Sequence, residues 1–157
     1  ISISKFDFKK QDDAKNINFG NQISYKSWEI ASGASEDLTY MNKGAIQLVV
    51  RPNKVSNKKI SFNIGCSKTE ESIKNSGSNI CYQSFDLSNA LADNKTNEWQ
   101  VIEIPLACLE VDNFNLSSIT SRASFSTEGN WILDVHSVKY INNKGYNACK
   151  IKSVSYE

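Results

Sequence analysis

The sequence predicts an all-β fold, an antiparallel β-sandwich of about eight to ten short strands. Apolar and polar residues alternate with a period of two along most of the chain, which is typical of strands with one buried and one wet face. Clusters of Asn, Gly and Ser separate these segments and have the composition of turns. The length of 157 residues favours one domain, spanning residues 1–157.

Strand-like alternation runs through the first half of the chain. In residues 45–51, Ile46, Leu48 and Val50 share one face, and Gln47 and Arg51 lie on the other. In residues 59–66 the same pattern places Ile60, Phe62 and Ile64 opposite Ser61 and Asn63. We expect further strands in residues 1–8, 16–19 and 23–30.

The second half of the chain continues the pattern after one break. Residues 85–94, "FDLSNALADN", predict a helical turn with Asp86 or Ser88 as its cap. Ile102, Ile104 and Leu106 then alternate toward the core, and Pro105 marks a strand end or an edge because it has no N–H to donate. Residues 121–127 and 131–141 predict the last two strands.

Charge and hydropathy exclude two classes of function. The chain has 18 basic and 17 acidic residues, a formal net charge of +1, so it lacks the basic excess of a nucleic-acid-binding protein. No apolar run approaches the roughly 18 residues of a membrane span. We therefore expect neither a nucleic-acid partner nor a membrane span.

The four cysteines, at positions 66, 81, 108 and 149, predict two disulfides in an extracytoplasmic protein. Zinc is disfavoured because there is no CxxC motif and His136 is the only histidine. Four cysteines allow three connectivities. We prefer Cys66–Cys81, which brackets a polar loop, with Cys108–Cys149, which ties a central strand to the C-terminal segment.

Four segments occur in an order that resembles a known family: "QDDAKNINF", "EDLTYMNKGAIQLVVR", "FDLSNALADN" with "EWQVIEIPLACL", and "FSTEGNWILDVHSVKYI" with "NAC". Together they are similar to the C-terminal galactose-binding-like jelly roll of bacterial exo-β-glucosidases and glucan glucohydrolases of glycoside hydrolase family 3. The four cysteines match that family's positions, which supports the preferred pairing. The resemblance covers about Gln11 to Cys149.

The resemblance implies a non-catalytic accessory module, excised from or appended to a larger glycoside hydrolase. Its implied function is to recognise β-glucan-type polysaccharide for the attached catalytic domain. The alternative is a structural domain that packs on the catalytic domain and shapes its active-site entrance without binding sugar. Either role implies an extracellular, periplasmic or outer-membrane-associated location.

Candidate sugar-binding residues combine aromatic platforms with polar side chains on the wet strand faces. An aromatic ring covers the apolar face of a pyranose, while Arg, Gln and Asn exchange hydrogen bonds with hydroxyl groups. If these strands share one concave sheet, their polar side chains line a single groove. The candidates are Trp28, Gln47, Arg51, Asn63, Tyr82 and Arg122. We expect Trp99 and Trp131 to pack in the core.

Catalytic and metal sites have weaker support. We expect no catalytic residue, because His136 has no nucleophile motif beside it and the paired carboxylates lie next to each other in polar loops. No cofactor is expected beyond a structural calcium ion, for which Asp7 and Asp134 offer hard oxygen ligands, with Asp12 and Asp13 as further candidates.

Overall fold

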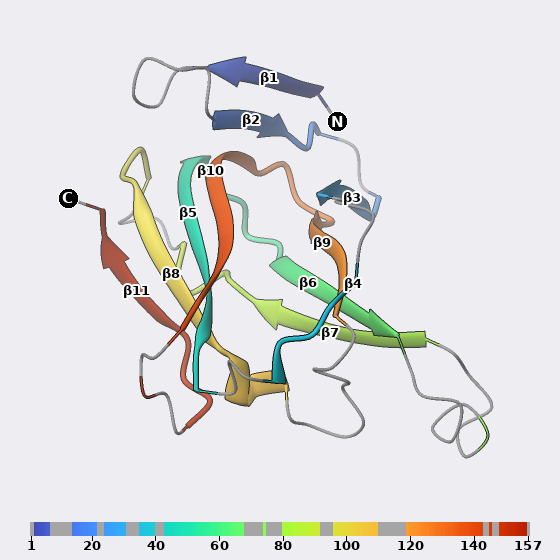
Figure 1. The fold of residues 1–157 in the computed structure, drawn as a ribbon. Helices are drawn as coiled ribbons and strands as arrows, with labels where there is room; N and C mark the ends of the chain where they lie inside the picture. Colours follow the sequence, from blue (N-terminus) through green and yellow to red (C-terminus); the bar gives the residue numbers. More distant parts are fainter. Residues whose placement is uncertain are drawn as a thin grey trace.

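The computed structural model contains two antiparallel sheets packed face to face, as the sequence predicts (Figure 1). It describes residues 2–6, 14–21, 24–30, 35–39, 43–67, 74, 80–91, 96–109, 119–142, 145 and 148–156. Within these ranges no helix is long and apolar enough to cross a membrane.

Six strands form sheet A, in the order β1-β2-β10-β5-β8-β11. Figure 1 shows β10, β5, β8 and β11 side by side, with β1 and β2 continuing the layer. The 3₁₀ helix η3, Leu106–Leu109, follows β8 directly. The strands of sheet A are β1 (Ser2–Phe6), β2 (Ala14–Asn18), β5 (Ala45–Lys54), β8 (Gln100–Pro105), β10 (Ile132–Ile141) and β11 (Lys152–Ser155).

Sheet B has the order β3-β9-β6-β7, and β4 also pairs with β9. The alternation predicted for residues 59–66 is confirmed in this sheet, because Ile60, Phe62 and Ile64 are fully buried. The strands of sheet B are β3 (Lys26–Ile30), β4 (Ser35–Glu36), β6 (Ile60–Ser67), β7 (Ile80–Asp86) and β9 (Ile119–Thr127).

The core lies between the two inner faces. Leu48 and Val50 of β5 and Ile102 and Ile104 of β8 contribute from sheet A and are fully buried. Phe125 of β9 packs from sheet B and lies 5.3 Å from Phe62, ring centre to ring centre. Each inward residue alternates with an outward one, so both sheets present an outer face whose side chains the core does not use.

One residue breaks the alternation of β10. The register with β5 shifts between Val135 and Ser137, so His136 is the extra residue of a β-bulge. Before the bulge Leu133 and Val135 face the core, and after it Val138 and Tyr140 pack against the core. The bulge therefore keeps both halves of the strand in phase with the interior.

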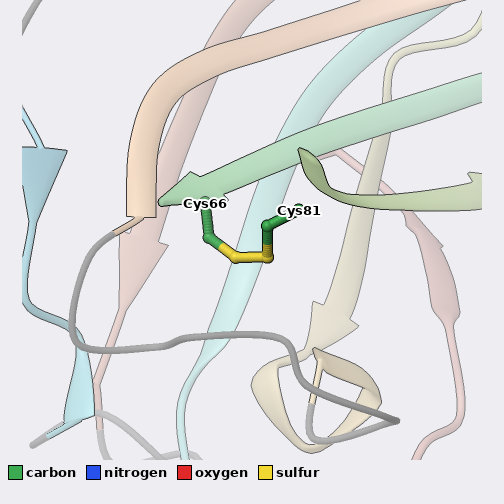
Figure 2. Close-up of a disulfide and its surroundings, with 2 residues drawn as sticks. All are labelled: Cys66 and Cys81. Atoms are coloured by element: carbon green, nitrogen blue, oxygen red, sulfur yellow. A yellow bond between two sulfur atoms is a disulfide. The ribbon is translucent and has the colours of Figure 1, made fainter. Parts of the chain in front are cut away.

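Both disulfides have the predicted pairing. Cys66 and Cys81 are register partners at the adjoining ends of β6 and β7 (Figure 2), with Cα atoms 5.0 Å apart. Cys108 of η3 bonds Cys149, with Cα atoms 4.7 Å apart. On the chain-entropy model each bond contributes about 3–4 kcal/mol of stability by restricting the unfolded chain.

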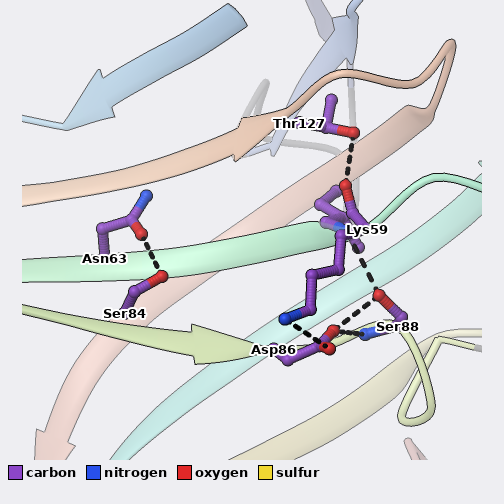
Figure 3. A network of polar contacts seen from close by, with 7 residues as sticks. Lys59, Asn63, Ser84, Asp86, Ser88 and Thr127 are labelled. Atoms are coloured by element: carbon purple, nitrogen blue, oxygen red, sulfur yellow. Dashed lines mark hydrogen bonds and ion pairs between the residues drawn. The ribbon is translucent and has the colours of Figure 1, made fainter. Parts of the chain in front are cut away.

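Polar contacts hold the turn after β7 (Figure 3). Asp86 Oδ1 accepts hydrogen bonds from the N–H and hydroxyl of Ser88, at 2.9 and 2.6 Å, and Lys59 Nζ lies 3.3 Å from Asp86 Oδ2. The predicted cap at Asp86 and the single turn that follows it are thus confirmed: residues 88–91 form a turn, and the Leu91 N–H donates to the Leu87 carbonyl oxygen at 3.0 Å. Burial alone would raise the pKa of Asp86, yet these donors hold it below its ordinary value.

Asp86→Asn should remove a stabilising effect that depends on pH. A carboxyl group whose pKa is lowered by folding stabilises the native state above its unfolded pKa and loses this effect as pH falls through the folded pKa. We expect the variant to be less stable than the parent at pH 7, by at most about 1 kcal/mol because Asp86 is partly exposed. The difference should shrink as the pH falls through the lowered pKa of Asp86. Urea unfolding at pH 7 and at pH 3 measures this; a difference that stays constant with pH would contradict the assignment.

A second set of contacts joins two turns where β9 ends. Trp131 Nε1 donates to the Lys58 carbonyl oxygen at 2.8 Å, and the Thr127 hydroxyl donates to the Lys59 carbonyl oxygen at 2.6 Å. Gly129 lies between these bonds, and its N–H donates to Thr127 Oγ1 at 2.8 Å. A Cβ atom at Gly129 would lie 2.8 Å from Ser56 Cβ and 2.9 Å from Lys58 Cβ, and would also meet Ser56 Oγ.

Gly129→Ala should therefore destabilise the fold by about 1–3 kcal/mol through overpacking. Replacing Ser56 by Gly in the same chain should recover part of the loss, because it removes two of the three clashing atoms. Urea midpoints of the parent, the two single variants and the double variant measure the coupling. Additive effects of the two substitutions would show that the contact with Ser56 is not the cause.

Candidate functional site

A buried carboxylate organises one end of the outer face of sheet A. Asp134 of β10 is the register partner of Arg51 of β5. Its Oδ2 accepts from Arg51 Nε at 2.8 Å and Nη2 at 2.6 Å, and its Oδ1 accepts from Asn16 Nδ2 at 2.5 Å. The side chain of Asp134 is 2% exposed and that of Arg51 is 30% exposed. Asp134 therefore fixes the guanidinium group in place, and part of that group stays accessible to solvent.

Arg51 in turn lies over an indole ring. Its Cζ atom is 4.9 Å from the centre of the Trp99 ring, within the range of a cation–π interaction. His136, from the bulge, approaches Trp99 edge-on, with ring centres 6.5 Å apart and an interplanar angle of 85°. Trp99 is partly exposed, so the structure holds an aromatic ring in a defined orientation at the surface.

Further polar side chains continue along the same face. Gln47 Nε2 donates to Glu103 Oε1 at 3.1 Å, across the β5–β8 pair. Lys139 and Lys152 are the next register partners on either side of this pair. Val101 lies on the same face between Glu103 and Trp99. This face thus combines an oriented indole ring, the apolar side chain of Val101, and both hydrogen-bond donors and hydrogen-bond acceptors.

The expectation of a single groove is wrong, because the candidate residues divide between two sheets. Gln47 and Arg51 lie on the outer face of sheet A. Asn63 and Tyr82 belong to β6 and β7 of sheet B, whose outer face points the opposite way. Arg122 is in β9 of sheet B, and its side chain lies outside the described part of the structure. The local sequence predicts which side chains of a strand face outward, but it does not predict to which sheet the strand belongs.

On the outer face of sheet B, Asn63 of β6 is hydrogen-bonded to both neighbouring strands, β9 and β7. It is 1% exposed, its Nδ2 donates to the hydroxyls of Ser126 and Ser124 at 2.8 and 3.2 Å, and its Oδ1 accepts from Ser84 at 2.8 Å (Figure 3). These bonds occupy the amide from both neighbouring strands. Tyr82 lies two strand positions away and is 53% exposed.

The tryptophans differ from expectation at two positions. Trp131 is buried as predicted. Trp28 packs against the core and stacks on Phe125, with ring centres 6.3 Å apart and an interplanar angle of 17°, so the geometry favours packing over a sugar platform. Trp99, expected in the core, lies outside it. The sequence carries the signal, because Trp99 is out of phase with Ile102, Ile104 and Leu106 and in phase with Glu103.

The calcium candidates find little support in the described part of the chain. Both oxygens of Asp134 accept hydrogen bonds, and the adjoining Arg51 guanidinium repels a cation. Asp7, Asp12 and Asp13 lie outside the described residues. Among the residues that are described, no group of three or more His, Cys, Asp or Glu side chains could hold a metal ion.

Comparison with known proteins decides the family. Residues 1–140 match the family Exop_C, described as galactose-binding domain-like. The chain belongs to this family. As a galactose-binding-like domain it is an accessory module and not a catalytic domain, as predicted. No curated protein matches it.

Solved structures share the fold of this galactose-binding-like domain. A family 30 carbohydrate-binding module of a cellulosomal cellulase from Clostridium thermocellum has a TM-score of 0.66 at 18% identity, covering 83% of this chain and 75% of that one. The extra C-terminal domain of an exo-1,3/1,4-β-glucanase, ExoP, from a Pseudoalteromonas species has a TM-score of 0.60 at 18% identity, covering 92% and 72%. In the complete ExoP chain the matched part is 16% of the length, at 15% identity and a TM-score of 0.60.

Asp134→Asn should release the Arg51 side chain and alter the surroundings of Trp99. The amide keeps the shape of the carboxylate but removes the charge that holds the guanidinium. We expect the free energy of unfolding to fall by about 1–3 kcal/mol. This is less than for a fully buried ion pair, because Arg51 is partly exposed. The indole N–H resonance of Trp99 should shift, while that of Trp131, bonded to Lys58, should not. Unchanged Trp99 resonances would show that Asp134 does not orient the ring.

Proposed function

We propose that this galactose-binding-like domain binds β-glucan-type polysaccharide on the outer face of sheet A and serves an attached glycoside hydrolase. The observation that carries the proposal is the Trp99 indole, held by Arg51 and His136 at the surface, on the same face of sheet A as Gln47 and Glu103. A glucan offers flat apolar ring faces and rims of hydroxyl groups. Its recognition needs an aromatic platform next to donors and acceptors, which is the combination found on this face.

The two disulfides agree with such a role outside the cytoplasm, because disulfides persist in oxidising compartments. Two proteins that share the fold are a carbohydrate-binding module and a domain of an exo-1,3/1,4-β-glucanase. Their descriptions support a saccharide ligand and a glycoside hydrolase partner. That the partner belongs to family 3 and lies in an extracellular, periplasmic or outer-membrane-associated setting rests on the sequence resemblance and is part of the proposal. The alternative remains a packing domain that shapes the entrance of the catalytic site.

The expected affinity is low. Each hydrogen bond to a sugar hydroxyl contributes only about 0.5–1.5 kcal/mol, because water competes for the same groups. A few such bonds and one covered ring, less the cost of association, correspond to a Kd of roughly millimolar to tens of micromolar. Titration calorimetry with laminarin, mixed-linkage glucan and cello-oligosaccharides can measure this range.

Trp99→Ala should weaken glucan binding by about five- to thirtyfold, because the loss of an aromatic contact surface costs about 1–2 kcal/mol. Tyr82→Ala is the matched control: it removes an exposed aromatic ring from the opposite sheet and should leave binding unchanged. Circular dichroism should show that both variants are folded. Arg51→Ala is a poorer probe, since it would leave Asp134 buried without its partner.

Three outcomes decide the proposal. Loss of binding in Trp99→Ala alone supports the site on sheet A. Loss in Tyr82→Ala alone would keep the function but move the site to sheet B. No heat from the parent at millimolar concentrations of any of these glucans would overturn sugar binding and leave the packing role.

A further inference from the structure

The edge strand β11 extends the apolar part of the proposed site. Val154 of β11 is the register partner of Val101 in β8, and the N–H of Tyr156 donates to the carbonyl oxygen of Trp99 at 2.9 Å. Since side chains alternate along a strand, Val154 and Tyr156 point to the same outer face as Val101 and Trp99. Two pairs of apolar or aromatic residues therefore lie side by side across β8 and β11.

The inner side of β11 attaches this strand to the rest of the domain. Ser153 donates to the Ala90 carbonyl oxygen at 3.4 Å and to Gln100 Oε1 at 3.3 Å, and Ile151 packs against the core. Val154, by contrast, is 58% exposed. Edge strands usually carry charged outward residues that prevent pairing with other chains. An exposed valine next to Val101 is thus not required by the fold of this strand.

We propose that β11 is a ligand-binding element: the glucan surface is a composite of β8 and β11, in which Trp99, Val101, Val154 and Tyr156 form one apolar floor. This inference rests on the proposed function. Neighbouring strands are about 5 Å apart, close to the length of one pyranose ring, so a chain lying across the strands places successive rings over β8 and β11. Arg51 at one end of the floor and Glu103 with Lys152 at the other contact the hydroxyl rims.

The Cys108–Cys149 disulfide is the covalent restraint on this element. Cys149 precedes the first residue of β11, Lys152, by three positions, and it is bonded to η3, which directly follows β8. The ladder between β11 and β8 covers four residues. Without the disulfide, a ligand would have to order β11 as it binds, and this ordering reduces affinity. Cys66–Cys81 joins β6 to β7 in the other sheet and so provides a matched control.

The position of β11 in the chain separates it from the segment that defines the family. The match to the family ends at residue 140, and β11 begins at Lys152. The element that completes the floor therefore lies beyond the part that assigns the chain to its family.

Substitution at Val154 tests the floor. Val154→Asp should weaken binding of mixed-linkage glucan and laminarin by about tenfold or more, because it places a charge where a ring face would lie. Val154→Ile keeps an apolar β-branched residue and should bind within about twofold of the parent. Equal affinity of the Asp variant, the Ile variant and the parent would overturn the composite floor.

Removal of each disulfide in turn tests whether Cys108–Cys149 is the restraint on β11. Cys108→Ser with Cys149→Ser should weaken binding of the same glucans by about tenfold, measured well below the unfolding temperature of this variant. Cys66→Ser with Cys81→Ser should bind like the parent under the same conditions. Equal effects of the two pairs would overturn a specific role of Cys108–Cys149. If Trp99→Ala abolishes binding while every β11 and Cys108–Cys149 variant binds normally, the composite site is wrong and the proposed function stands; if the parent binds no glucan, both are wrong.

Discussion

Contact between the inner faces of the two sheets imposes one constraint on every strand. Leu48 and Val50 of β5 must meet the row of Phe62 and Phe125 from sheet B, so their neighbours Gln47 and Arg51 are turned outward. The same requirement fixes β8, where Ile102 and Ile104 face the core. Within the strands, only the outward side chains are therefore available to a ligand, and the chemistry of a face is decided by which outward residues the strand order brings together.

On sheet A this order produces a chain of interactions that links β10, β5 and the start of β8. Asp134 orients Arg51, Arg51 lies over Trp99, and His136 contacts the ring from its edge. Burial of the carboxylate makes this arrangement stiff, since an unpaired charge at that position would be costly. A stiff aromatic platform loses little conformational entropy on binding, which matters for a ligand whose individual hydrogen bonds are weak. The fold and the proposed recognition of sugar are linked at this point.

The sequence alone is sufficient to predict the fold class and the inward faces of β5, β6 and β8, because alternation and turn composition are local signals. It is also sufficient for the disulfide pairing, because the family resemblance supplies the cysteine positions. It is not sufficient for the site. Gln47 and Asn63 have the same local pattern, yet β5 and β6 belong to opposite sheets, and no period along the chain encodes that choice. The position of Trp99 is predicted wrongly, although its place in the alternation of the strand puts it on the outer face with Glu103. The strands β4, β7 and β11 are not predicted. β4 and β11 are only two and four residues long, and the sequence of β7, ICYQSFD, does not alternate regularly between apolar and polar residues.

The extra residue in β10 has a consequence for how this region can change. His136 acts as a phase shifter: the strand before it presents Asp134 to the outer face, and the strand after it presents Val138 and Tyr140 to the interior. Loss of this residue would leave Val135 opposite Val50 and Ser137 opposite Val49, the pairing that they already have, so the second half of the strand would keep its inward and outward faces. The alternation of β10 thus survives either a change of residue at position 136 or its removal, and the imidazole beside Trp99 can vary without altering which side chains of the strand face the core.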